Sequence, residues 1–211
     1  MGALTLLIVG ILPLAAPANG PEEVEGKELQ DRGWLVDTVQ LTEGDRPGIQ
    51  RLFASGRFLL PAAQVWDAVP GVGDTGTWPG ITESVLEASN GDTSIRRYTL
   101  SIPLYTDRHY RLRKIHDRDR MSLQFSMVPG YGNVREIKGS WTVRALSDSL
   151  TGLEYRLDTD PGVRWIPEFI VRWATKRMIP RTFAQVHRAA NGPRSQSTKI
   201  DVESRQHQST R

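Results

Sequence analysis

Histidine is the side chain that most often transfers protons or binds metal ions near neutral pH, and this chain has four. They are His109, His116, His187 and His207. Their spacing is not that of a metal site, and no Gly-x-Ser-x-Gly motif accompanies them. The chain has no cysteine, which excludes disulfides, thiolate zinc sites and cysteine nucleophiles. The sequence therefore predicts no metal site and no set of catalytic residues.

A glycine-rich segment, Gly71-Val72-Gly73-Asp74-Thr75-Gly76, matches the Gly-x-Gly-x-x-Gly pattern of dinucleotide sites. That pattern binds pyrophosphate only when a strand precedes it and a helix follows it. Here a short helical pattern and Pro70 precede it, and Thr77-Trp78-Pro79-Gly80 follows it. We therefore expect a flexible loop and no cofactor.

Size and charge narrow the class of protein. A length of 211 residues with 38% hydrophobic residues fits a single domain with a substantial core. The formal net charge of +3 comes from 27 basic and 24 acidic residues, and no clustered basic motif accompanies it. We therefore expect no nucleic-acid partner.

The N-terminus has the pattern of an export signal. Residues 3–14 form an uncharged apolar run, which is shorter than the ~20 residues of a membrane span. Ala16-Pro17-Ala18 follows with the small-x-small form of a signal-peptidase site. We predict a signal peptide over residues 1–18 and a periplasmic or secreted protein. Because the run has no Lys or Arg before it, an uncleaved anchor or a different start codon stays open.

The middle of the chain predicts an antiparallel sheet. A polar N-terminal arm over residues 19–33 precedes it, and a short helix is expected over residues 61–69. Strands are expected over residues 34–41, 49–60, 81–86, 94–102, 108–115, 121–128, 137–146 and 153–159. Alternation places Tyr98, Leu100, Ile102, Tyr110, Leu112, Leu123, Phe125, Met127, Trp141, Val143, Tyr155 and Leu157 on an apolar face. A polar face collects Arg97, Thr99, Ser101, Arg111, Arg113, Gln124, Ser126, Thr142, Arg144, Glu154, Arg156 and Asp158.

A long amphipathic helix is predicted to follow the sheet, ending near Ala190. Ile166, Phe169, Ile170 and Trp173 recur at three- and four-residue intervals, as on a buried helix face. Only this helix is long enough to cover the apolar face of the sheet. Its basic residues Arg172, Lys176, Arg177 and Arg181 are either an ordinary solvated face or a surface that docks on anionic lipid. Residues 191–211 form a polar tail that we expect to be disordered.

Three segments resemble the steroidogenic acute regulatory protein-related lipid-transfer (START) domains of the helix-grip superfamily. They are Gly48-Ile49 at the start of a strand, residues 103–110, and Asp160 to Ile170 at the start of the last helix. The resemblance covers residues 34–190. It implies an α+β helix-grip fold, in which a curved antiparallel sheet wraps around a long C-terminal helix and encloses an apolar cavity. Val163, where the family has a second glycine, and His109, where it often has Asp, depart from the pattern.

The same resemblance implies that the apolar face lines a lipid site. The implied lipid-binding residues are Tyr98, Leu100, Arg108, Tyr110, Leu112, Phe125, Met127, Trp141, Val143, Tyr155, Trp165, Phe169 and Trp173. Some family members hold a lipid head group with a carboxylate and an arginine. Here Arg108 or Lys114 is the candidate cation and Glu83 the candidate carboxylate, although no motif fixes that pair.

These patterns lead to one preferred function and two alternatives. We expect a monomer that binds one lipid, of the sterol, hopanoid, fatty acid or phospholipid class, and transfers it through transient contact with a membrane surface. Pro180 is a candidate hinge for release. One alternative is a cyclase- or hydrolase-like helix-grip enzyme acting on a hydrophobic substrate, with Tyr110, Glu83 or Arg108 as the reactive group. The other is an interaction module whose solid core binds no apolar molecule.

Overall fold

The protein folds into one curved antiparallel sheet with helices packed on one side, in the α+β arrangement expected from the sequence. The computed structural model describes residues 21–46, 48–72, 80–101, 106–162 and 168–192. In chain order the elements are α1 (Pro21–Arg32), β1 (Trp34–Glu43), β2 (Gln50–Phe58), α2 (Ala62–Ala68), the 3-10 turn η1 (Val69–Gly71), β3 (Ile81–Asn90), β4 (Thr93–Leu100), β5 (Arg108–Asp117), β6 (Ser122–Met127), β7 (Glu136–Ala145), β8 (Thr151–Asp160) and α3 (Glu168–Asn191).

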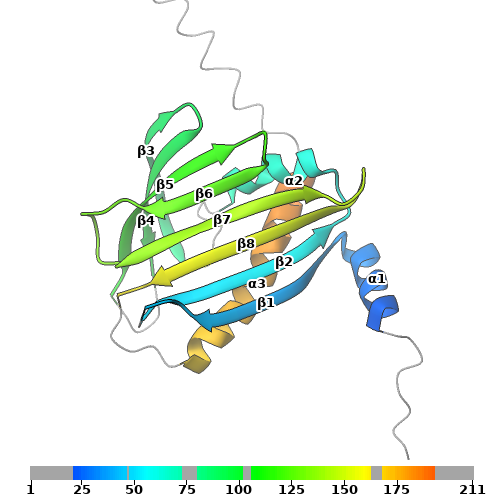
Figure 1. The fold of residues 1–211 in the computed structure, drawn as a ribbon, viewed down its shortest axis with the longest axis horizontal. Coiled ribbons are helices and arrows are strands. Elements are labelled where there is room, and N and C mark those ends of the chain that lie inside the picture. The colour runs from blue at the N-terminus through cyan, green and yellow to red at the C-terminus, as the bar shows by residue number, and fades with distance from the viewer. Residues whose placement is uncertain (1–20, 47, 73–79, 102–105, 163–167, 193–211) are drawn as a thin grey trace, which may run out of the picture.

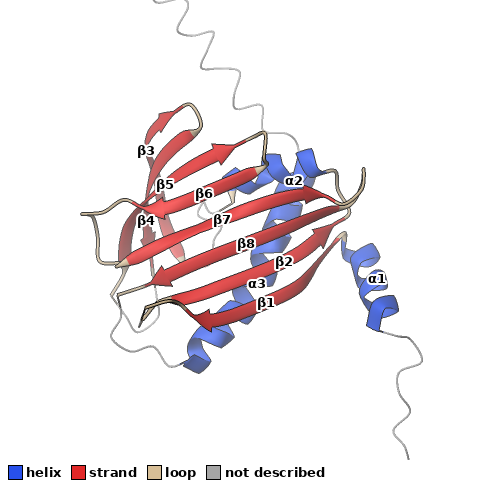
Figure 2. Cartoon of the chain, in the orientation of Figure 1, coloured by secondary structure: helices blue, strands red, loops and turns tan. Residues whose placement is uncertain are grey.

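All eight strands belong to a single sheet, in the order β1-β2-β8-β7-β6-β5-β4-β3. Neighbouring strands are antiparallel, and β2 pairs with β8, so the first hairpin closes onto the last strand. Figure 1 shows this sheet as a strongly twisted surface with α2 and α3 behind it. The helices coloured in Figure 2 therefore define an inner, helix-covered face and an outer face that is directed away from α2 and α3.

The strands follow the sequence pattern closely, with differences at their ends. The hairpin between β3 and β4 turns at Gly91 and Asp92, because Asn90 still pairs with Thr93. Gly91 has a φ of 55°, which suits a glycine in a tight turn. The strand β3 consequently extends to Asn90, four residues beyond the expected end. The register of its pairing with β4 shifts between Leu86 and Ala88.

The two helices α2 and α3 share the inner face. α3 is a single 24-residue helix that packs on β1, β2 and α2, while α2 packs on β7 and β8. The expectation that the last helix alone covers the apolar face was therefore wrong. A straight helix can follow only part of a twisted sheet, and α2, whose Val65 and Trp66 are buried, packs on β7 and β8.

The best-packed part of the core lies where α3 crosses the sheet. Ile179, Phe183 and Val186 are fully buried on one side of α3. The ring of Trp141 on β7 lies 6.4 Å from that of Phe183 and 4.1 Å from that of Tyr155 on β8, measured between centroids. Helix α3 continues through Pro180, and the Thr182 hydroxyl donates to the Met178 carbonyl at 3.0 Å.

The N-terminal arm is a helix in its described part. Leu29 of α1 is buried, and the guanidinium of Arg32 lies 4.6 Å from the ring centroid of Trp34, a cation–π contact. None of the helices within the described ranges is long and apolar enough to cross a membrane.

Candidate functional site: the inner face of the sheet

The residues that the sequence placed on an apolar face share one face of the sheet, apart from Ile102, which lies outside the described residues. Tyr98, Tyr110, Leu112, Phe125, Trp141, Val143 and Tyr155 are buried on the inner side, and Leu100 and Met127 are partly buried beside them. The period of two in the strands predicts this result, because alternate side chains point to the same face. Three of the expected site residues are not placed: Trp165 lies outside the described residues, and the side chains of Phe169 and Trp173 are not described.

Aromatic rings form two groups along this face. Tyr98 on β4 stacks on its cross-strand neighbour Tyr110 on β5, with ring centroids 5.3 Å apart. The second group joins Phe125, Trp141 and Tyr155, and the centroids of Phe125 and Tyr155 are 6.3 Å apart. Stacked rings present flat apolar surface, which suits contact with a ring system or an acyl chain.

Burial keeps the inner tyrosines neutral. The pKa of Tyr110 is raised far above its usual range because burial removes water from the phenolate. The pKa of Tyr155 is raised by burial first and by repulsion from Tyr110 second. Such hydroxyls can donate or accept a hydrogen bond with a ligand, but they do not supply a base near neutral pH.

Cationic groups lie at the β4–β5 end of the same face. Lys114 is only 6% exposed, and its Nζ lies 5.8 Å from the ring centroid of Tyr98. Arg108, at the start of β5, has a buried Nε with no hydrogen-bond partner among the described residues. On β4, Nη1 of Arg96 donates to the Ser84 hydroxyl at 3.3 Å. The inner face is therefore apolar over most of its area and polar at one end.

The expectation that Glu83 is the carboxylate partner of these cations was wrong. It accepts hydrogen bonds from Nη1 of Arg97 at 3.0 Å and from the Thr99 hydroxyl at 3.1 Å, both on the outer face. An irregularity in pairing between Ile81 and Glu83 changes the alternation at the start of β3, and this places Glu83 outward. The sequence analysis did not identify Arg96 as a residue of the inner face. Arg96 lies two residues before Tyr98 on β4, and this spacing is the signal that could have placed both side chains on the same face.

The two motifs that flank the site have local physical roles. Asp160 at the end of β8 accepts a hydrogen bond from the Gly162 amide at 2.8 Å, and Gly162 has a φ of 71°. A side chain at Gly162 would also lie 2.8 Å from the Asn133 carbonyl oxygen, so glycine is required there. The start of β5 is held by the Asn133 side chain, which accepts from the His109 amide and donates to the Asp107 carbonyl, both at 2.9 Å.

The described candidates His109 and His187 lie on different elements, β5 and α3, and His207 lies outside the described residues. His109 contacts Thr99 on the outer face, and His187 lies on α3 against Phe58 and Asn191. No group of three metal-ligating side chains occurs within the ranges that the structure describes. Gly71 is the last residue of η1, which comes directly after α2, whereas the dinucleotide fingerprint needs a preceding strand. Residues 73–79 of that segment lie outside the described ranges.

Comparison with known proteins supports the fold. Sequence comparison found no matching protein-family model and no matching curated protein. The structure is similar to a STAR-related lipid transfer protein from Xanthomonas axonopodis, with a TM-score of 0.51 and 16% identity over 71% of this chain and 99% of the other. Human STARD10 gives a TM-score of 0.50 with 12% identity, over 84% and 82% of the two chains. The Zhui aromatase/cyclase from Streptomyces sp. R1128 gives 0.51 with 14% identity, over 67% and 91%.

These similarities confirm the START-type helix-grip fold, an open curved sheet with a C-terminal helix. At these identities they show the fold alone. The neighbours include both lipid-transfer proteins and an aromatase/cyclase.

Proposed function

We propose that the protein binds a single amphiphilic lipid against the inner face of its sheet and carries it between membranes outside the cytoplasm. The observation that carries this proposal is the composition of the inner face, where stacked aromatic rings lie beside buried polar groups. An apolar ligand bound against these rings removes its own surface from water at about 25 cal/mol per Å². Capture therefore needs no catalytic residue.

The polar end of the face suggests how the ligand is oriented. The Nε of Arg108 is buried without a partner in the described part of the chain, and a buried donor without a partner costs free energy. The polar group of a ligand would supply the missing acceptor. The head group then lies near Arg108 and Tyr110 at the start of β5, and the apolar part lies toward Phe125 and Trp141.

Membrane contact is proposed to occur through the exposed side of α3. Lys176, Arg177 and Arg181 are exposed there, while Ile179 and Phe183 are buried on the opposite side. Each cation near an anionic lipid surface contributes ~1 kcal/mol of binding. Three cations on one helix face are enough for reversible docking, which fits delivery better than permanent anchoring.

The direct test is to identify what the protein carries. The protein is isolated from its export compartment and examined by native mass spectrometry, with delipidated protein as the control. The expected result is one bound lipid per chain, which exchanges with a fluorescent sterol or fatty acid. Delipidated protein that takes up no apolar probe would overturn the proposal and favour an interaction module with a solid core.

A helix-grip enzyme acting on a hydrophobic substrate remains the competing function. Arg108 is the observation that favours it, because a cation with an unpaired donor beside Tyr110 could polarise a carbonyl of a bound substrate. Chromatography coupled to mass spectrometry separates the two functions, since a carrier returns its ligand chemically unchanged, whereas an enzyme returns a product that differs in mass or in retention time.

A further inference from the structure

The outer face of the sheet contains an open groove of about 650 Å³, on the side away from α2 and α3. Its floor comes from short polar side chains of β6 and β7, and Lys138 of β7 also lines it. The floor residues are Ser122, Gln124, Ser126, Ser140 and Thr142. Longer side chains from β5 on one side, and from β2 and β8 on the other, form the walls: Arg113, Ile115, Arg51, Phe53 and Arg156. The groove exists because two central strands carry small residues between neighbours that carry large ones.

Strand pairing aligns the lining residues in rows across the sheet. One row runs from β2 to β5 through Phe53, Arg156, Ser140, Gln124 and Ile115. The adjacent row runs through Arg51, Asp158, Lys138, Ser126 and Arg113. Because neighbouring strands lie ~4.8 Å apart, each row spans about 19 Å. The groove therefore suits an extended ligand that lies across the strands.

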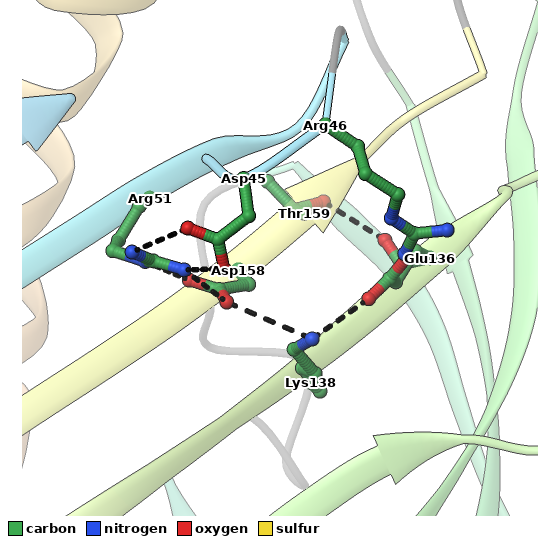
Figure 3. A network of polar contacts seen from close by, with 7 residues as sticks. All are labelled: Asp45, Arg46, Arg51, Glu136, Lys138, Asp158 and Thr159. Carbon is green, nitrogen blue, oxygen red and sulfur yellow. Dashed lines mark hydrogen bonds and ion pairs between the residues drawn. The ribbon is translucent and has the colours of Figure 1, made fainter. Parts of the chain in front are cut away.

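At the β2 end of the second row, the positive and negative side chains are equal in number. Figure 3 shows its ion pairs, in which Arg51 binds Asp45 at 2.9 Å and Asp158 at 3.0 Å, and Lys138 binds Glu136 at 3.0 Å. Arg46 also pairs with Glu136. Three cations thus face three carboxylates, and this network fixes the wall without leaving a net charge for a ligand.

Positive charge is in excess elsewhere along the groove. Arg113 is exposed, and no ion pair or hydrogen bond joins its side chain to the rest of the described structure. Arg156 shares the carboxylate of Glu154 with Arg144, at 3.3 Å and 3.7 Å, and its guanidinium lies 5.0 Å from the ring centroid of Phe53. Two unbalanced positive charges, from Arg113 and from the Arg144–Arg156 pair, therefore border the hydroxyl-rich floor.

We propose that this groove binds an anionic oligosaccharide, at a site separate from the inner face. Hydroxyl and amide side chains both donate and accept hydrogen bonds, as sugar hydroxyls do, and arginine pairs with carboxylate groups in a bidentate manner. Arg113 and Arg156 lie three strand spacings apart, about 14 Å. A lone phosphate or a single sugar ring is too short to reach both, and a planar membrane surface does not reach the floor of a groove.

The test uses whole protein and three probes: tetragalacturonate, the neutral sugar maltotetraose, and tripolyphosphate as an anion without a sugar. Binding is followed by calorimetry and by amide NMR shifts at physiological salt. Tetragalacturonate is expected to bind and to shift amides of β6 and β7. Arg113→Gln should weaken binding about fivefold, and Ser140→Leu, which fills the floor, should weaken it at least as much.

Arg118→Gln is the matched control, because Arg118 is an exposed cation in the turn after β5 and does not line the groove. It should leave tetragalacturonate binding unchanged, and all variants should unfold at the wild-type temperature. The proposal is overturned if tetragalacturonate does not bind, if maltotetraose or tripolyphosphate binds as tightly, or if Arg118→Gln weakens binding as much as Arg113→Gln. Lipid uptake is measured in parallel and should not change, so the outcome is independent of the carrier function.

Discussion

Phe183 on α3 stacks on Phe58 on β2 with ring centroids 5.8 Å apart, and both side chains are fully buried. Close approach of the helix depends on Gly56, where a Cβ would lie 2.6 Å from the Phe183 ring. This contact joins the last helix to the first hairpin of the sheet. It therefore fixes the solid end of the core, independently of any ligand.

Phe183→Ala should destabilise the protein by about 3–5 kcal/mol, because it removes a buried aromatic ring and leaves a cavity against Phe58. Chemical denaturation of the delipidated protein measures the change. Arg181→Ala, an exposed change on the same helix, should stay within about 0.5 kcal/mol of wild type. Equal stability of the two variants would contradict the packing described here.

Tryptophan substitutions on the inner face separate a cavity from a solid core. Val143 lies near the end of β7, which packs on α2, so Val143→Trp should overpack and destabilise by ~1–3 kcal/mol. Leu112 lies on β5, beside the proposed ligand. Leu112→Trp should take up the space proposed for the ligand, leave the melting temperature nearly unchanged, and reduce uptake of a fluorescent lipid. If both variants lose stability equally and the wild type takes up no probe, the interior is solid.

The buried tyrosines predict loss of stability at alkaline pH. Burial raises the pKa of Tyr110 and Tyr155 above the ordinary value of 10.0, so only the unfolded state releases these protons readily. Stability should therefore be unaffected below about pH 10 and fall as the pH rises above it. Phenolate absorbance should show these two tyrosines ionising only as the circular dichroism of the folded state is lost. Tyr110→Phe should retain more stability at alkaline pH than wild type.

The polar tail should be dispensable for folding and lipid uptake when the truncation leaves α3 complete. The helix extends to Asn191, one residue beyond the expected boundary, and the Asn191 side chain donates to the His187 carbonyl at 3.0 Å. A chain ending at Gly192 should therefore keep its melting temperature and its lipid uptake. A large drop in either would show that residues 193–211 contribute to folding or binding.

Export should be accompanied by cleavage after Ala18, since the apolar run of residues 3–14 ends at Ala-Pro-Ala. Sequencing the N-terminus of protein from cells tests this expectation. Protein that retains Met1 and stays in the cytosol would remove the proposed compartment, while leaving the inner-face site unaffected.

Local periodicity determined much of the fold from the sequence. The alternation around Tyr98, Tyr110 and Trp141 identified both the strands and their buried face, because side chains repeat every two residues in any strand. The helix face predicted from Ile166, Phe169, Ile170 and Trp173 stays a prediction, because those side chains are not described. The buried face that the structure does describe on α3 comes from Ile179, Phe183 and Val186. The prediction for Glu83 was wrong because a register shift between Ile81 and Glu83 changes which side chains face inward. The sequence carries no signal for that shift.

The sequence by itself determined the fold class, the positions of the strands to within two residues at all but one end, and the residue types available on each face, since these depend on contacts within a few residues. Only the tertiary structure decided which residues meet across strands. Arg113, Ser126 and Lys138 line one row because β5, β6 and β7 pair in a particular register. Register depends on turn geometry and on packing of the whole inner face against α2 and α3, and a shift of one residue would reverse every side chain.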